Sequence, residues 1–111
     1  MSQRFGLEAV TIAKICAVFA RYPQVEKAVI FGSRAKGNYK PGSDIDLSLY
    51  GDAGLTREVL YQIMAEIDDL LLPYTIDLSI FHALSDPDFI GHIQRVGVVF
   101  YEKKSVVEGS L

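Results

Sequence analysis

The chain has 111 residues, half of them apolar, and a formal net charge of −3 at pH 7. This length fits one domain with one apolar core. The slightly acidic balance argues against a general nucleic-acid binder, so no extended nucleic-acid surface is expected, and a single cysteine excludes an intramolecular disulfide.

The hydropathy pattern predicts a cytoplasmic protein. The opening residues, Met1 to Gly6, are not followed by the apolar segment of a secretory signal peptide. No apolar run approaches the roughly 20 residues that a membrane-spanning helix needs. We therefore expect neither export nor insertion into a membrane.

A helix is predicted over residues 7–21, and a strand over Val25–Phe31 follows it. The apolar residues of the first segment recur with helical spacing: Ile12, Ile15, Cys16 and Phe19. Cys16 is therefore expected to be a buried structural thiol rather than a reactive one. Pro23 prevents the helix from continuing, and the next segment is rich in β-branched residues.

A polar loop follows this strand and has the composition of a phosphate-binding loop. Gly32 lets the backbone come close to a ligand, and Ser33 begins a short segment compatible with one helical turn. Three cationic side chains add positive charge: Arg34, Lys36 and Lys40. Each of them, read alone, is equally consistent with an ordinary surface charge. Tyr39 is consistent with stacking on a base or with a plain surface turn.

The next predicted strand, residues 43–50, carries two aspartates on one face. Because side chains alternate along a strand, Asp44, Asp46 and Ser48 share a polar face. The opposite face is apolar and consists of Ile45, Leu47 and Leu49. Two neighbouring carboxylates repel each other unless a cation lies between them. Oxygen ligands of this kind favour Mg²⁺ or Mn²⁺ over zinc.

A second helix is predicted from Thr56, its N-cap, to Pro73. Its apolar residues form one stripe: Leu60, Ile63, Met64, Ile67 and Leu71. The acidic residues Glu66, Asp68 and Asp69 are expected to form a solvated face of this helix.

A third strand, residues 74–81, repeats the pattern of the second. Both contain Ile-Asp-Leu-Ser, so in one sheet Asp77 can lie beside Asp46, and Ser79 can match Ser48. An acid in the middle of an apolar strand needs an exposed face or a partner. Three clustered acids near a phosphate loop indicate metal-assisted displacement at phosphorus.

The last predicted elements are a helix that opens at residues 85–88 and a strand at Val98–Tyr101. The helix opening combines a capping side chain with Pro87, and the helix is expected to end at Arg95 or Val96, before Gly97. Neither His82 nor His92 has a metal-ligand companion, so both are read as structural or surface residues.

The elements together predict an α/β (α+β) fold with a single mixed β-sheet of about four strands and helices packed against it. We assign residues 1–101 to one domain. Residues 102–111 have little apolar content and are expected to be a flexible tail.

The motif Gly32-Ser33, ten residues, then Asp44-x-Asp46, with Asp77 in a later strand, resembles the polymerase-beta-type nucleotidyltransferase superfamily. More narrowly, it resembles the small stand-alone minimal nucleotidyltransferase (MNT) group. The resemblance covers about Val25 to Tyr101. It implies the nucleotidyltransferase fold and transfer of a nucleoside monophosphate from an NTP, most often ATP, to a hydroxyl group.

The resemblance also implies roles for particular residues. The nucleotide phosphates would lie against five residues: Gly32, Ser33, Arg34, Lys36 and Ser43. Asp44 and Asp46 would bind two Mg²⁺ ions, with Mn²⁺ as the alternative. Asp77 would join the second ion and accept the proton of the acceptor hydroxyl.

Proteins of the MNT group are commonly paired with a small all-helical HEPN protein. In such pairs HEPN is often an RNase toxin, and the MNT protein is the antitoxin that adenylylates it, typically on a tyrosine. Two alternatives stay open: transfer to a small molecule such as an aminoglycoside, and a non-catalytic nucleotide-binding subunit of a complex. Base specificity, the number of nucleotides transferred, and a homo-oligomeric or hetero-oligomeric state also stay open.

Overall fold

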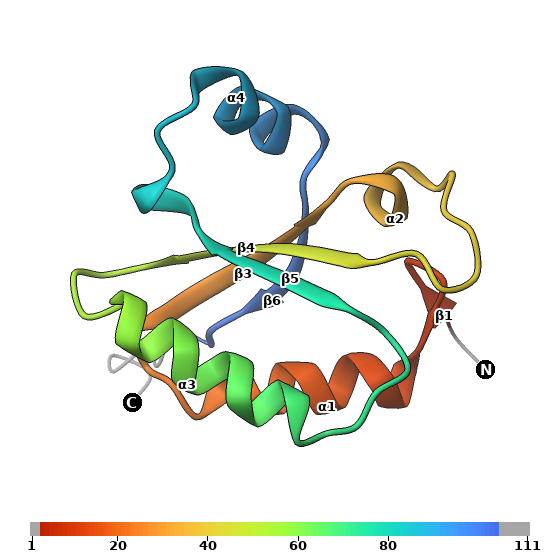
Figure 1. Cartoon of the computed structure of the whole chain (residues 1–111), viewed down its shortest axis with the longest axis horizontal. Helices are drawn as coiled ribbons and strands as arrows, with labels where there is room; N and C mark the ends of the chain where they lie inside the picture. The colour runs from red at the N-terminus through yellow and green to blue at the C-terminus, as the bar shows by residue number, and fades with distance from the viewer. Residues whose placement is uncertain (1–2, 105–111) are drawn as a thin grey trace, which may run out of the picture.

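The computed structural model describes residues 3–104 and contains one mixed four-stranded sheet with helices on both faces (Figure 1), which confirms the expected fold class. The elements in chain order are β1 (Gln3–Arg4), β2 (Leu7–Glu8), α1 (Ala9–Ala20), β3 (Val25–Phe31), α2 (Ser33–Lys36), β4 (Ile45–Gly51), α3 (Arg57–Asp68), β5 (Ile76–Ile80), the 3-10 turn η1 (Phe81–Ala83), α4 (Pro87–Val96) and β6 (Val98–Glu102). No helix among the described residues has the length and hydropathy to cross a membrane.

The strand order of the sheet is β5-β4-β3-β6. Strand β3 pairs antiparallel with β4 and with β6, whereas β4 and β5 are parallel. A parallel pair needs a crossover connection, and α3 supplies it. The resulting register places Asp46 opposite Asp77 and Ser48 opposite Ser79, which confirms that the two repeated segments are neighbours.

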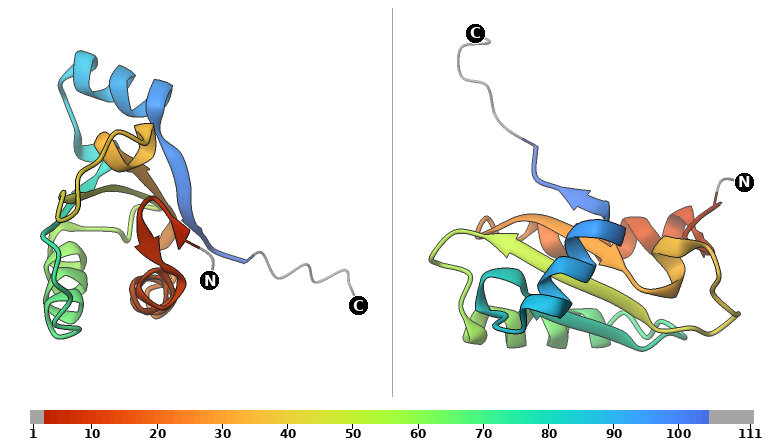
Figure 2. Two further views of the ribbon diagram at one scale, coloured as in Figure 1. Left: turned by 90° about the vertical axis from the view of Figure 1, so that its right-hand side faces the viewer. Right: turned by 90° about the horizontal axis from the view of Figure 1, so that it is seen from above.

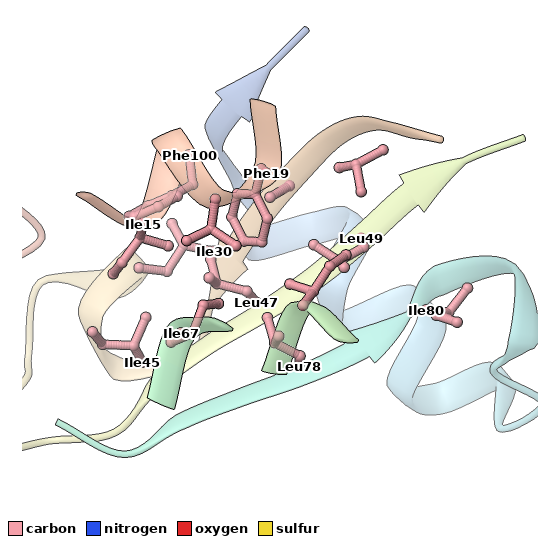
Figure 3. Packing of buried hydrophobic residues seen from close by; sticks show 14 of the residues in the cluster. Ile15, Phe19, Ile30, Ile45, Leu47, Leu49, Ile67, Leu78, Ile80 and Phe100 are labelled. Atoms are coloured by element: carbon pink, nitrogen blue, oxygen red, sulfur yellow. The ribbon is translucent and has the colours of Figure 1, made fainter. Parts of the chain in front are cut away.

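The main core lies between the sheet and the helices α1 and α3, which cover the same face (Figures 1 and 2). Figure 3 shows how this face is filled by side chains of the helices and of all four strands, among them Ile15, Phe19, Ile30, Leu47, Leu49, Ile67, Leu78 and Phe100. The apolar face of β4 is fully buried here. The alternation along β4 therefore directs Asp46 to the opposite face of the sheet.

A smaller core lies on that opposite face, beneath α4. Val29, Phe31 and Ile93 are its buried members, and Phe89 and Val96 pack against them. The helix begins as expected, because Pro87 occupies its first turn and the Asp86 side chain accepts a hydrogen bond from the Asp88 backbone N–H. Helix α4 thus covers the β3 side of this face.

The expected first helix is wrong at its N-terminal end. Residues Leu7–Glu8 form β2, which pairs with β1, and α1 begins at Ala9. The turn between the two short strands uses left-handed backbone at Phe5 (φ 59°) and Gly6 (φ 72°). Leu7 is fully buried, so its apolar character serves the hairpin rather than a helical stripe.

The expected second helix begins correctly and ends too late. Thr56 caps α3 by accepting a hydrogen bond from Val59 N at 3.3 Å. The helix ends at Asp68, and Leu71, with φ 56°, is 87% exposed and takes no part in the stripe. The left-handed backbone at Leu71 stops the helix before Pro73 is reached.

The acidic residues of α3 were expected to form a solvated face, but one of them, Glu66, has fixed partners. The Glu66 carboxylate accepts hydrogen bonds from the Tyr22 hydroxyl and from the Arg21 guanidinium, with Arg21 Nε at 2.9 Å. These contacts connect the end of α1 with α3. Asp68 and Asp69 are exposed, as predicted.

Two smaller expectations concern Cys16 and the C-terminal end. Cys16 is half-buried, its Sγ donates to the Phe100 carbonyl oxygen at 3.7 Å, and burial raises its pKa, as a structural thiol requires. Strand β6 continues to Glu102, and Lys103 N donates to the Glu26 carbonyl oxygen at 2.9 Å. Residues 102 and 103, which were predicted to belong to a flexible tail, therefore contact the sheet, and residues 105–111 of that prediction lie outside the described residues.

Candidate active site

The two central acids of the candidate site are Asp46 and Asp77, which lie opposite each other on the parallel strands β4 and β5. Asp46 is half-buried and Asp77 is exposed. Asp44 is also exposed and lies one residue before β4 begins, so the pleat of the strand does not fix its side chain. Burial raises the pKa of Asp46, and the charges of Asp77 and Asp44 raise it further. The three predicted acids are therefore close enough to interact.

These side chains do not form a closed metal cage. Within residues 3–104, no group of three or more His, Cys, Asp or Glu side chains is arranged to hold a metal ion. The donor set nevertheless suits a hard divalent cation, because Mg²⁺ usually binds one or two carboxylates and completes its shell with waters and phosphate oxygens. The repulsion that raises the Asp46 pKa would be relieved by such a cation.

Gly32 brings the loop after β3, which was predicted to bind phosphate, against Asp46. It is the N-cap of α2, with φ 78° and ψ −156°, a backbone region open essentially to glycine alone. A Cβ atom at this position would lie 2.5 Å from Asp46 Oδ2. The absence of a side chain therefore lets the loop backbone pass directly beside the Asp46 carboxylate.

The short helix α2 follows Gly32 and ends at Gly37, which has φ 87°. Ser33 is its first residue and is partly exposed, and Lys36 is exposed. The first N–H groups of a helix have no partner within it, so they are available to an external acceptor. Gly32, Ser33 and Lys36 thus lie together on one short loop next to Asp46.

Arg34 differs from the exposed cations of the loop, because its side chain is buried and is not available for the phosphate contact that was predicted for it. Its side chain is only 3% exposed. Nε and Nη2 donate to the Ser43 carbonyl oxygen at 3.0 and 2.8 Å, and Nη1 donates to the Phe5 carbonyl oxygen at 2.8 Å. The guanidinium lies 5.3 Å from the Tyr39 ring centroid and 5.0 Å from that of Tyr74. Arg34 therefore connects three chain segments and has no free face for a nucleotide.

Ser43 and Tyr39 shape the loop before β4. Ser43 Oγ accepts a hydrogen bond from Lys40 N at 2.8 Å, and the Ser43 carbonyl oxygen accepts from Arg34. The Tyr39 ring lies against Gly6 as well as Arg34, so of its two predicted roles the structure supports the surface turn. Ser43 is half-buried and closes a turn that begins at the exposed residue Lys40, because Ser43 N donates a hydrogen bond to the Lys40 carbonyl oxygen.

A serine pair lies two residues further along the same strands, next to the acid pair on the same face. Ser79 Oγ donates to Ser48 Oγ at 3.2 Å, and Ser48 is fully buried. The match between these serines was predicted, but their hydrogen bond was not. It connects β4 and β5 on the face that carries the acids.

Neither His82 nor His92 belongs to a group of side chains that could hold a metal ion among the described residues. His82 is exposed in η1, and the His92 ring packs edge-on against Phe31 with the ring centroids 6.5 Å apart. Both therefore have the surface or structural roles that were predicted for them.

Comparison with known proteins agrees with this geometry. A family model described as polymerase beta, nucleotidyltransferase matches residues 13–106. A Haemophilus influenzae protein that carries the name "Probable protein adenylyltransferase MntA" is 38% identical over 81 residues, which span 70% of this chain and 68% of that protein.

Solved structures share the fold at lower sequence identity. A toxin–antitoxin complex with AMP-PNP has a TM-score of 0.68 at 18% identity, covering 84% of this chain and 74% of the other. The complex of a tri-AMPylated Shewanella oneidensis HEPN toxin with its MNT antitoxin has a TM-score of 0.62 at 16% identity, covering 85% and 71%. From the family match over most of its length and from the similarity to the Haemophilus protein, this chain belongs to the polymerase beta nucleotidyltransferase family.

Proposed function

We propose that this protein transfers AMP from ATP to a hydroxyl group of a partner protein. Two observations carry the proposal together: Asp46 lies opposite Asp77, and the Gly32 backbone passes beside the Asp46 carboxylate. A nucleotide whose phosphates lie along the Gly32 loop would have its α-phosphate next to this acid pair. The similarity to a protein named as a protein adenylyltransferase supports a protein as the acceptor.

The nucleotide would be held by the loop and by one exposed cation. The backbone of Gly32 and Ser33 would approach the phosphates, and Lys36 would neutralise part of their charge. Ser43 would position the end of the loop, since its hydroxyl and carbonyl oxygens are both bonded within it. Arg34 would act only through the packing of the loop.

Asp44, Asp46 and Asp77 would hold the metal. Nucleotidyltransferases of this kind generally use divalent metals, and we propose Mg²⁺, with two ions expected and Mn²⁺ as the alternative. When bound, the metal would stabilise charge on the phosphates and lower the pKa of the acceptor hydroxyl. Asp46 and Asp77, from neighbouring strands, would fix its position relative to the loop.

In the proposed reaction the acceptor oxygen forms a bond to the α-phosphorus of ATP, and the bond from that phosphorus to the pyrophosphate oxygen breaks. The exposed Asp77 carboxylate accepts the hydroxyl proton and passes it to solvent. The products are the AMP-modified acceptor and pyrophosphate. Positioning and charge neutralisation supply most of the rate enhancement in such reactions.

We further propose that the acceptor is a helical HEPN-type toxin, that its modification inactivates it, and that this chain acts as the antitoxin. Two structural neighbours support this part of the proposal, since both are toxin–antitoxin complexes and one contains an AMPylated HEPN toxin.

The test is transfer of label from [α-³²P]ATP in the presence of Mg²⁺ and host lysate. We expect one labelled protein band, identified by mass spectrometry as carrying AMP, and its loss with Asp46→Asn. Glu26→Gln is the matched control, because Glu26 is an exposed acid elsewhere on the sheet. Full activity of Asp46→Asn would contradict the assignment, and ATP binding without any label would indicate a non-catalytic nucleotide-binding subunit.

A further inference from the structure

Strand β5, which carries Asp77, is an edge strand of the four-stranded sheet, because β4 is its only neighbour among the strands of residues 3–104. An edge strand presents a row of backbone N–H and C=O groups to its surroundings. In Figure 1 no other helix or strand of the described residues lies along the outer side of β5. The edge that carries the proposed catalytic acid Asp77 can therefore pair with a further strand.

The hydrogen-bond pattern shows which groups face outward. Ile45 N donates to the Thr75 carbonyl oxygen at 2.9 Å, so the backbone of residue 75 faces β4. Backbone groups alternate in direction along a strand, and those of residues 77 and 79 therefore also face β4. The N–H and C=O groups of Ile76, Leu78 and Ile80 face away from the sheet.

The two faces of this edge differ in chemistry. On one face lie Asp77 and Ser79, beside Asp46 and Ser48 of β4. On the other face, between β5 and α3, is a groove of about 80 Å³ whose wall includes the side chains of Met64, Ile67, Leu72, Ile76 and Leu78 together with the polar groups of Asp68 and Tyr74. Met64 lines this groove and is 37% exposed, so its side chain is accessible from outside.

We propose that the free edge of β5 is the docking site of the acceptor, which adds an extended segment there as a fifth strand of the sheet. Because side chains alternate along a strand, the hydroxyl-bearing residue would lie on the face of Asp77, and the residues before and after it would lie on the groove side. Neighbouring strands are about 4.8 Å apart, which brings the hydroxyl residue beside the acid. The acceptor segment thus has the pattern apolar, hydroxyl, apolar.

The charges of the edge argue for a different protein rather than a second copy of this chain. Two copies joined through β5 would place both Asp77 side chains, each with its Asp46 neighbour, on the same face of one continuous sheet. Like charges on neighbouring strands destabilise the pairing. An acceptor segment without acids, in contrast, leaves the face free for a nucleotide and its cation.

This inference rests on the proposed transfer to a protein, and its test uses the acceptor purified from the labelling assay. Met64→Asp places a charge in the groove, and Tyr61→Asp is the matched control, because Tyr61 is 58% exposed on the same helix and does not line the groove. We expect Met64→Asp to raise the KM for the acceptor about tenfold or more, with the KM for ATP unchanged. Tyr61→Asp is expected to leave both constants unchanged.

Hydrogen exchange gives a second and more direct measurement. In the Asp46→Asn variant with acceptor and a non-hydrolysable ATP analogue, the amides of Ile76, Leu78 and Ile80 should become protected. If the acceptor is labelled normally by Met64→Asp and these amides stay unprotected, the docking proposal is wrong while the transferase proposal stands. If no protein accepts label from the wild-type chain, both proposals fail.

Discussion

At the scale of single residues, the contact between Gly32 and Asp46 decides how closely the loop between β3 and β4 approaches the acids. The loop can pass at this distance because position 32 has no Cβ atom, which would otherwise lie 2.5 Å from Asp46 Oδ2. The same residue has a backbone conformation that other amino acids rarely adopt. Glycine is therefore required here for two separable reasons, backbone strain and space.

Gly32→Ala is expected to abolish transfer, and Gly37→Ala is the variant that separates the two reasons. Gly37 also has positive φ (87°), but a Cβ atom there meets no other atom within 4 Å. We expect Gly37→Ala to cost about 1 kcal/mol of stability with activity retained. Gly32→Ala should cost about 1–3 kcal/mol and displace the Asp46 carboxylate as well. Urea unfolding and the labelling assay measure both effects, and equal loss of activity in the two variants would contradict the role of the contact.

At the scale of elements, Arg34 and Glu66 connect parts of the chain that are distant in sequence. Arg34 of α2 bonds the hairpin at Phe5 and the loop at Ser43, and Glu66 of α3 bonds Tyr22 at the end of α1. Both are charged residues with fixed partners. Each therefore supports the arrangement of the elements around the sheet rather than the chemistry itself.

Arg34→Lys is expected to destabilise the fold by about 1–3 kcal/mol, because the half-buried carbonyl oxygens of Ser43 and Phe5 would lose their guanidinium donors. Lys36→Ala, on an exposed side chain of the same helix, should change stability by less than about 0.5 kcal/mol and weaken ATP binding. Urea unfolding and calorimetric titration with Mg-ATP distinguish the two. Loss of ATP binding without loss of stability in Arg34→Lys would restore the phosphate contact that was first predicted from the sequence.

The Glu66 contacts give a pH dependence with a definite sign. The hydrogen bond from Tyr22, and then that from Arg21, lowers the pKa of Glu66 below its ordinary value of 4.5. An acid whose folded-state pKa is lowered stabilises the fold above its unfolded-state pKa, and this contribution is lost as the pH falls through the folded value. Glu66→Gln should therefore be less stable than the wild type at neutral pH.

The stability difference between Glu66→Gln and the wild type should shrink as the solution is acidified below the ordinary pKa of 4.5. Urea unfolding over a pH series measures it, with Glu26→Gln as an exposed control on β3. A difference between Glu66→Gln and the wild type that stays constant with pH would show that the carboxylate charge is not what stabilises the link between α1 and α3.

At the scale of the whole molecule, the sequence was sufficient for the sheet and for the pairing of Asp46 with Asp77, whereas Asp44, which was predicted on the same strand face, lies before β4 begins. The repeated Ile-Asp-Leu-Ser pattern has the period of a strand, and its two copies became the neighbouring strands β4 and β5. The burial of Arg34 could not be predicted, because its partners are backbone carbonyl oxygens far away in the chain. The hairpin and the end of α3 were missed because Phe5 and Leu71 have left-handed backbone, which such residues rarely adopt.

The parallel pairing of β4 and β5 also determines when the site can come into existence. The bonded serines Ser48 and Ser79 are 31 residues apart, and the strands that carry them can pair only when the chain between them, which includes α3, crosses over the sheet. The antiparallel strands β3 and β4 need a shorter connection, so their pairing closes a smaller loop and costs less entropy. We expect the acids to meet late in folding. A newly made chain would then gain its chemistry only when its whole sheet is assembled, so that activity itself reports completed folding.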